Sequence, residues 1–269
     1  MELTSDNYYS PEANREYLSV SQYKEFMGSG GRPGCEFRSM QILDGKWREA
    51  EMSDAMLIGS YVDSYIEGPK SFHRFVADHP EMYKGDGSMY KKYEVADKVI
   101  NRIKRDRLFM QYLSGEKQAI MTGEIGGAKW KIKMDSYIPG AAIVDLKVVR
   151  SITEFHFSED YGEKIDFVRY WGYDLQGAVY QEIVRQNTGE KLPFFIAAAT
   201  KEDEPDIEII RIPQTTLDMA LNNAIIQVPK IVELRAHRMK PVRCGLCSCC
   251  RHYKVLTEPV WLDELVAKY

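Results

Sequence analysis

The chain has 269 residues, of which 44% are hydrophobic and 28% charged, and its formal net charge at pH 7 is −4. This composition excludes a disordered or collagen-like chain. The net charge excludes a protein that coats nucleic acid by bulk positive charge, although not a local basic channel. No apolar run approaches the roughly 20 residues that span a bilayer, and the first residues lack the pattern of a secretory signal. We therefore expect a cytoplasmic protein without membrane contact.

The first 115 residues are predicted to be mainly helical. Ser21 is expected to cap a short helix, Ser53 a second one that ends near Ile66, and residues 90–114 show the apolar spacing of a long helix. After residue 117 the apolar period changes from about 3.6 to 2, which indicates strands. The elements predicted beyond this point are strands at 118–124, 128–138 and 141–149, a helix at 164–186, strands at 193–200 and 206–213, and a helix at 216–238.

This order of elements predicts one α/β domain over residues 1–269, with a mixed central sheet flanked by helices. We divide it into an N-terminal helical part (1–115), a core (116–213), and a C-terminal helix with a cysteine-rich end (214–269). No internal repeat and no long linker separates these parts.

Two aspartates and a lysine stand out on adjacent predicted strands of the core. Asp145 and Lys147 share one face of a strand because side chains alternate, and the Pro-Gly turn before that strand can bring Asp135 close to Asp145. Two neighbouring carboxylates repel unless a cation lies between them, and hard oxygen ligands suit Mg²⁺ or Mn²⁺. The lysine can offset charge on a phosphate, so the set suits a metal-dependent phosphodiesterase. Polar residues on a solvated sheet face are the alternative interpretation.

The cysteines form a second candidate site. Four of the five lie within seven residues, at 244, 247, 249 and 250, and Cys35 lies near the N-terminus. In a chain without an export signal, the spacing C-x-x-C-x-x-C indicates thiolates that converge on a metal ion or a cluster.

The core resembles that of PD-(D/E)xK (restriction-endonuclease-like) nucleases, and specifically the RecE-like phage and prophage exonucleases. The resemblance is carried by GxxWKIKMDSYI and IVDLK, and by LSVSQYKEF, IGSYVDSYIEGP and YWGYDLQGAVYQEIV, which match in order. It implies catalytic roles for Asp135, Asp145 and Lys147, and metal ligation by the backbone carbonyl of Leu146. It also implies that two residues on one face of the following helix flank the site: Gln176 and Tyr180.

Two further acids are candidate metal ligands by the same resemblance. Many relatives carry a histidine where Asp63 stands, and aspartate is an equally hard ligand. Glu124 precedes the Gly-Gly turn of the first predicted hairpin. Either acid can instead be an ordinary surface residue.

The cysteine spacing resembles that of AddB-type helicase–nucleases and certain CRISPR-associated exonucleases, which hold an iron–sulfur cluster with one cysteine before the nuclease core and three after it. The resemblance implies a [4Fe-4S] cluster, with Zn²⁺ or an empty reduced site as alternatives. The implied ligands are Cys35, Cys244, Cys247 and Cys250, whereas Cys249 is off the spacing and is expected to be a bystander.

Two basic groups are candidate DNA contacts, with a solvated face as the alternative for each. One alternates along a predicted strand and the other precedes the cysteines: Lys129, Lys131 and Lys133, and Arg235, Arg238, Lys240 and Arg243.

The resemblance implies a Mg²⁺-dependent exonuclease that resects duplex DNA with free ends from 5′ to 3′. Its 3′ single strand would pass to a RecT-like annealing protein in phage-type recombination, and relatives imply a homo-oligomeric ring. The alternatives are a structure-selective endonuclease on the same fold and a non-enzymatic cluster or zinc protein that binds DNA.

Overall fold

The computed structural model describes residues 1–48 and 52–263. Residues 49–51 and 264–269 lie outside the described part, and so does the end of the predicted segment 214–269. Within the described residues, no helix combines the length and the apolar character needed to cross a membrane.

The centre of the molecule is a four-stranded mixed sheet with the order β10-β9-β6-β5. Its strands are β5 (Ser136–Ile138), β6 (Ala142–Val149), β9 (Phe194–Thr200) and β10 (Ile207–Arg211). β6 and β9 run parallel, whereas the two outer pairs are antiparallel. The predicted mixed sheet is therefore confirmed. β6 and β9 are buried on both faces, which explains why their sequences are almost continuously apolar.

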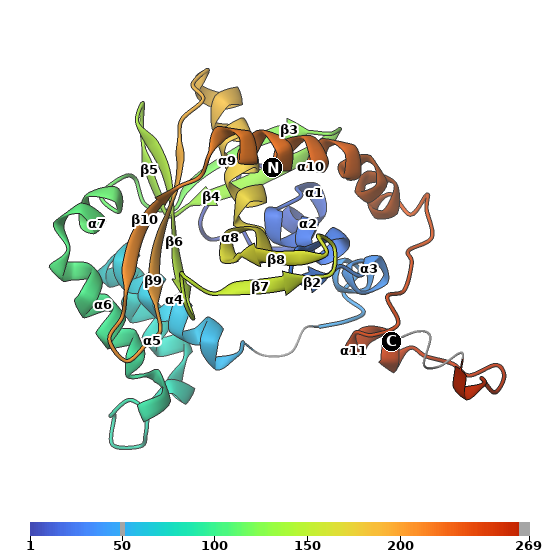
Figure 1. Cartoon of the computed structure of the whole chain (residues 1–269), viewed down its shortest axis with the longest axis horizontal. Coiled ribbons are helices and arrows are strands. Elements are labelled where there is room, and N and C mark those ends of the chain that lie inside the picture. Colours follow the sequence, from blue (N-terminus) through green and yellow to red (C-terminus); the bar gives the residue numbers. More distant parts are fainter. Residues whose placement is uncertain (49–51, 264–269) are drawn as a thin grey trace.

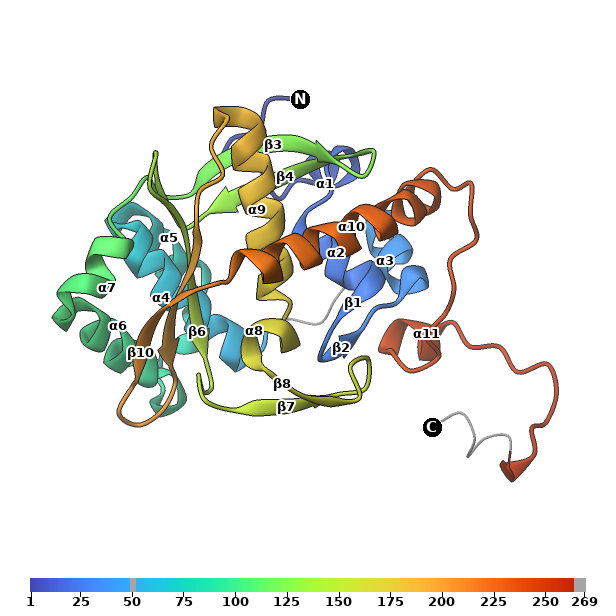
Figure 2. The same cartoon turned by 45° about the horizontal axis from the view of Figure 1, so that its top comes forward.

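Helices cover both faces of this sheet (Figures 1 and 2). On one face, α4 (Asp54–Glu67), α6 (Val95–Arg105) and α7 (Arg107–Tyr112) pack on Val144 and Leu146. On the other face, α9 (Tyr173–Thr188) and α10 (Gln214–Arg235) pack on the alternate residues of the same strands. A Cβ atom at Gly177 would lie 2.4 Å from the ring of Phe194, so this glycine lets α9 approach β9 closely.

The strand predicted over 128–138 is broken at Asp135. Its first part, β4 (Ala128–Met134), forms a separate two-stranded sheet with β3 (Ala119–Ile125), and its second part is β5. The pairing of β5 with β6 ends at Ser136 and Val144. The backbone N–H of Leu146, farther along β6, donates instead to the side-chain Oδ2 of Asp135 at 2.9 Å. The Asp135 side chain thus takes the place of a backbone hydrogen-bond partner, and the chain passes from one sheet to the other at Asp135.

Two predicted helices are also divided. The region 90–114 contains a 3₁₀ turn, η2 (Lys91–Tyr93), followed by α6 and α7, because Asp106 leaves the helix and caps α7 by accepting the N–H of Phe109. The region 164–186 begins with β8 (Glu163–Asp166) and α8 (Phe167–Tyr170), and Gly172, at φ +63°, separates α8 from α9.

The N-terminal helix α2 (Val20–Met27) is capped by Ser19 rather than by the expected Ser21. Ser19 and Gln22 form a reciprocal capping box, which the sequence S-x-x-Q specifies. The second predicted helix is confirmed as α4 with Ser53 as its cap. The elements that the periodicity did not predict are short or local: α1 (Pro11–Glu16), β1 (Gly28–Ser29), β2 (Arg32–Pro33), α3 (Glu36–Leu43), α5 (Pro69–Asp78), η1 (Pro80–Met82), β7 (Phe155–Ser158), β8 and α11 (Ser248–His252).

Candidate active site

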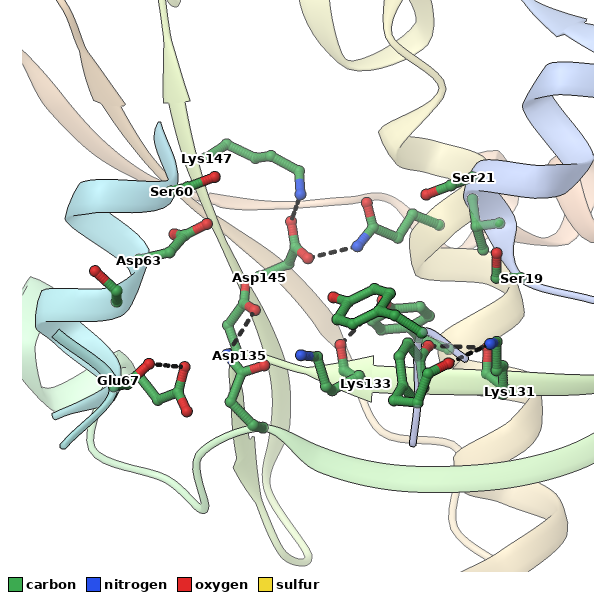
Figure 3. A pocket seen from close by; sticks show the side chains of 18 of the residues that line it. Ser19, Ser21, Ser60, Asp63, Glu67, Lys131, Lys133, Asp135, Asp145 and Lys147 are labelled. Atoms are coloured by element: carbon green, nitrogen blue, oxygen red, sulfur yellow. Dashed lines mark hydrogen bonds and ion pairs between the residues drawn. The ribbon is translucent and has the colours of Figure 1, made fainter. Parts of the chain in front are cut away.

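A pocket of about 760 Å³ opens beside the central sheet where β4, β5 and β6 meet α4 and α9. A cluster of three carboxylates and one ammonium group lies among its lining residues, with Asp63 on α4, Asp135 between β4 and β5, and Asp145 and Lys147 on β6 (Figure 3). The structure therefore brings together these four predicted site residues from α4, β6 and the junction between β4 and β5.

Asp145 is the most deeply buried of the acids, with 2% of its surface exposed. Its Oδ1 accepts a hydrogen bond from Gln176 Nε2 at 2.5 Å, and its Oδ2 forms an ion pair with Lys147 Nζ. Burial acts to lower the pKa of Lys147, but the attraction of the Asp145 carboxylate outweighs burial, so the pKa is raised. Lys147 is therefore held as a cation, and Gln176 fixes the carboxylate that holds it.

The other two carboxyl groups are destabilised as anions in the absence of a cation. Burial, and then the nearby Asp145, raise the pKa of Asp135 to about 7. Burial, and then Asp135, raise the pKa of Asp63 well above its usual value. Each carboxylate thus disfavours the charge of the next, although Lys147 acts in the opposite direction on both.

The donor set fits a hard divalent cation. Asp63, Asp135 and Asp145 lie around one lysine, Lys147, so carboxyl groups outnumber cations in this cluster, although further acidic and basic residues also line the pocket. Oxygen ligands of this kind suit Mg²⁺ or Mn²⁺ better than zinc, which favours nitrogen and sulfur. Asp63, Asp135 and Asp145 can supply side-chain oxygens. The backbone N–H of Leu146 orients Asp135 by the hydrogen bond described above.

Gln176 and Tyr180 lie on one face of α9 and both line the pocket, as the spacing predicted. Their functions differ. Gln176 contacts Asp145 directly, whereas the hydroxyl of Tyr180 donates to the backbone oxygen of Lys133 at 3.1 Å. Tyr180 therefore ties β4 to α9 and acts as a positioning residue.

Several lining residues were not identified from the sequence. Lys24 on α2 is bonded to the backbone oxygen of Trp171 at 3.0 Å, and burial, and then Lys147, lower the pKa of its ammonium group to about 8. Glu67 lies one turn after Asp63 on α4, a spacing that is visible in the sequence. Gln118 Nε2 lies 3.4 Å from Asp135 Oδ1, but its sequence carries no signal of this contact.

Glu124 is not brought to this pocket. It is exposed near the tip of the β3–β4 hairpin, opposite Lys129, and Gln186 bonds its backbone N–H and oxygen. Because this hairpin leaves the central sheet, the end of β3 that carries Glu124 points away from Asp135. The structure gives no support to Glu124 as a ligand of the same metal.

The predicted basic residues divide between the pocket and contacts elsewhere in the molecule. Lys129 is exposed and pairs with Glu16 at 3.3 Å, whereas Lys131 and Lys133 line the pocket. In the second group, Arg235 donates to three backbone oxygens at the end of α1, and Arg238 pairs with Glu233. Arg235 therefore ties α10 to the N-terminal segment, whereas Arg238 forms an exposed local ion pair.

A second site lies beside α3 and α11, at the opposite side of the molecule from α7 (Figure 1). The Sγ atoms of Cys35, Cys244, Cys247 and Cys250 all lie within 4.8 Å of one another. The separations are 3.5 Å for Cys35 and Cys250, 3.8 Å for Cys35 and Cys247, and 3.9 Å for Cys244 and Cys250. The structure thus assembles the predicted ligand set, and Cys249 is buried outside it.

Backbone N–H groups point at these sulfur atoms. Cys35 accepts from Arg38, Cys244 from Cys247, and Cys247 from Cys250, each at 3.4 Å. Burial acts to raise the pKa of Cys244, but such N–H groups outweigh it and lower the pKa to about 7, whereas burial raises the pKa of Cys247 to about 12 and also raises that of Cys250. Thiolates are the form that binds metal, so the local backbone suits a metal site.

Comparisons with known proteins agree with this geometry. The model of the family described as "PDDEXK-like domain of unknown function (DUF3799)" matches residues 19–253. The chain belongs to this family. A crystal structure from Eubacterium rectale, described as a "putative exonuclease", has 56% sequence identity and a TM-score of 0.94, over 99% of both chains.

A second solved structure, of the protein SSO0001, aligns at 14% identity and a TM-score of 0.29, over 72% of this chain and 85% of that one, which is too distant to support an argument. No curated protein matches the chain. The PDDEXK-like fold and a relationship to nucleases are thus shown.

Proposed function

We propose that the protein is a metal-dependent DNA exonuclease that hydrolyses phosphodiester bonds at the end of a duplex. The observation that carries this proposal is the placement of Asp135, Asp145 and Lys147 in one pocket of a PDDEXK-like domain. Its similarity to a protein described as an exonuclease supports the same reaction class.

The side chains have distinct functions in this reaction. Asp63, Asp135 and Asp145 would hold Mg²⁺ or Mn²⁺, together with the carbonyl of Leu146, and the bound ion would supply Lewis-acid stabilisation of the phosphate and a more acidic water. Lys147 is a fixed cation beside Asp145 that orients the attacking water and offsets charge on the phosphate oxygens. Gln176 keeps Asp145 in place, since the two are directly hydrogen-bonded.

The deciding experiment compares linear and circular DNA. Linear duplex labelled at either the 5′ or the 3′ end is incubated with the protein and Mg²⁺, beside closed circular plasmid and beside the Asp145→Asn protein. An exonuclease degrades only the linear substrate, and the label released first gives the polarity. Cleavage of the closed circle would favour the structure-selective endonuclease, and absence of metal-dependent cleavage would favour the DNA-binding alternative.

We propose 5′ to 3′ resection, with delivery of the 3′ strand to a RecT-like annealing protein in the cytoplasm of a bacterial host. This role and a ring-shaped homo-oligomer rest on the resemblance to RecE-like enzymes. Release of 5′-terminal label first, and a multiple of 31.0 kDa by light scattering, are the expected results.

The resemblance implies a [4Fe-4S] cluster at the cysteine site, with Zn²⁺ as the alternative. From the sulfur spacing we propose the alternative, a single tetrahedral Zn²⁺ ion, with the cluster as its rival. Sulfur atoms about 2.3 Å from one zinc ion stand about 3.8 Å apart at the corners of a tetrahedron. Three of the six sulfur separations, at 3.5, 3.8 and 3.9 Å, lie near this value, and the others are at most 4.8 Å. Thiolates on four different irons lie farther apart, because each sulfur lies beyond its own iron. Metal analysis of anaerobically purified protein decides: one colourless zinc supports the proposal, and brown protein with several irons refutes it.

A further inference from the structure

One wall of the catalytic pocket is made by the N-terminal segment against strand β4. Tyr8 and Tyr9 line the pocket there, together with Lys131 and Lys133. The two tyrosine rings meet edge to face, with centroids 5.0 Å apart. This wall holds none of the carboxylates described above, so its contribution differs from metal binding.

The buried Lys131 fixes the tyrosine segment in place. Only 1% of its surface is exposed, and its ammonium group donates to the backbone oxygen of Tyr8 and, at 2.7 Å, to Asn14 Oδ1. It also lies 4.6 Å from the centre of the Tyr8 ring, and Tyr8 itself is 6% exposed. A buried lysine with these contacts holds residues 8–14 rigidly against β4, so the position of Tyr9 is defined before any ligand arrives.

Tyr9 and Lys133 are the two residues of this wall that remain available. Tyr9 is 69% exposed although it lines a pocket, and the Lys133 ammonium lies 4.6 Å from its ring and 5.4 Å from that of Tyr8. Among the described residues, no carboxylate pairs with Lys133. Its backbone oxygen accepts the Tyr180 hydroxyl, which ties this position to the catalytic side of α9.

Lys133 also stands at a suitable distance from the reacting centre. It lies two residues before Asp135, where the chain leaves β4, so the Cα atoms of the two residues are at most about 7 Å apart. Neighbouring phosphates of an extended single strand are separated by a similar length. A phosphate bound near Asp135 therefore places the next one within reach of the Lys133 ammonium.

We propose that Tyr9 and Lys133 form a subsite for the nucleotide that adjoins the scissile phosphate. The Tyr9 ring stacks on the base and Lys133 binds the phosphate, the combination by which proteins hold single strands without reading sequence. A base can stack on Tyr9 only when it is unpaired, so the preferred ligand is a single-stranded or frayed DNA end. This inference rests on the proposed nuclease function for the identity of the scissile phosphate.

The first test measures binding of a short fluorescent single-stranded oligonucleotide by anisotropy, with Ca²⁺ in place of Mg²⁺ to suppress cleavage. Tyr9→Ala should weaken binding about 5- to 150-fold, because stacking of one base is worth about 1–3 kcal/mol. Tyr9→Phe should restore it. Tyr90→Ala removes an exposed tyrosine outside the pocket and should bind like wild type.

An abasic series identifies the nucleotide. Oligonucleotides that lack one base at successive positions are cleaved with Mg²⁺, and the wild type should lose kcat/KM when the base next to the cut is missing. The Tyr9→Ala protein should no longer distinguish this substrate from the intact one. A loss of the same size in both proteins would show that the ring touches no base and would overturn the stacking assignment.

Lys133 is tested by salt. Removal of one phosphate contact lowers the slope of log Kd against log salt by about one. Lys133→Ala should show this change and Lys133→Arg should not, whereas Lys129→Ala, on the same strand but outside the pocket, should keep the wild-type slope. An unchanged slope for Lys133→Ala would refute the phosphate contact.

The two proposals fail in different ways. If the wild type cleaves no DNA with any divalent metal, the nuclease function is wrong, and the binding arms still decide whether Tyr9 and Lys133 hold a single strand. If the wild type cleaves DNA but Tyr9→Ala and Lys133→Ala bind and cleave like it, the subsite alone is wrong.

Discussion

Substitution of Asp135 by asparagine should make the metal-free protein more stable at pH 8 while it removes metal-dependent activity. Burial and the nearby Asp145 raise the pKa of this carboxyl from 3.8 to about 7. Between these values the unfolded chain is ionised here and the folded chain holds a proton. The contribution of Asp135 to the free energy of unfolding is therefore full below pH 4, falls as the pH rises, and is lost above pH 7. Asparagine cannot ionise, and its side-chain oxygen can still accept the N–H of Leu146.

The size of the effect follows from the shift. A change of about three pKa units corresponds to about 4 kcal/mol at most, and solvent in the open pocket reduces this to about 2 kcal/mol. For a chain of this length, about 2 kcal/mol is a rise of roughly 4–8 °C in the unfolding temperature. The raised pKa of Asp63 acts in the same direction, so the variant keeps part of the pH dependence.

The assay is thermal unfolding in chelator at pH 4, 5, 6, 7 and 8, repeated with Mg²⁺. Without metal, the unfolding temperature of the Asp135→Asn protein should equal that of the wild type near pH 4 and be higher from pH 7 upward. At pH 8, Mg²⁺ should raise the unfolding temperature of the wild type much more than that of the variant. Exposed Asp160→Asn is the matched control. If metal-free wild type is equally stable from pH 4 to 8, or if Asp135→Asn is less stable at pH 8, Asp135 is not held uncharged and the reasoning is wrong.

The remaining predictions concern Lys147, Gln176 and the cysteines. Lys147→Met should lower kcat about 100-fold or more with little change in KM, since its charge matters most as charge develops on the phosphate; equal losses in both would indicate a simple DNA contact. Gln176→Leu should cost about 10- to 100-fold in activity or metal affinity, measured by metal titration, because Asp145 loses its orienting donor. Cys35→Ser should contain less metal and unfold at a lower temperature. The loss of the cross-link should lower the free energy of unfolding by at most about 4–5 kcal/mol. Cys249→Ser should keep its metal content; loss of metal there would place Cys249 among the ligands.

The parts of the site that follow from local rules could be predicted from the sequence. Strand alternation places Asp145 and Lys147 on one face, and helical spacing places Gln176 and Tyr180 on one face, and both arrangements are found. Each rule needs only residues a few positions apart. The mixed sheet followed in the same way from the order of strand-like and helix-like segments.

The features that failed depend on contacts between distant segments. The break at Asp135 arises because a residue on another strand, Leu146, donates to its side chain, and no periodicity records such a bond. Once the chain breaks there, Glu124 moves away with its hairpin. Lys131 looked like one of three surface lysines, but residues 8–14 cover it and make it a buried anchor.

The two candidate sites are connected through helix α2. Its Lys24 lines the catalytic pocket, and the next residue, Glu25, accepts the backbone N–H of Cys35 at 2.9 Å and pairs with Arg38 beside the cysteines. A metal held by the cysteines would therefore fix Cys35 at one end of a segment, residues 24–35, whose other end lines the catalytic pocket. The carboxylates themselves sit on the central sheet and on α4, which do not depend on that metal. Loss of the cysteine metal should thus lower stability first, and reduce activity only as α2 and Lys24 shift.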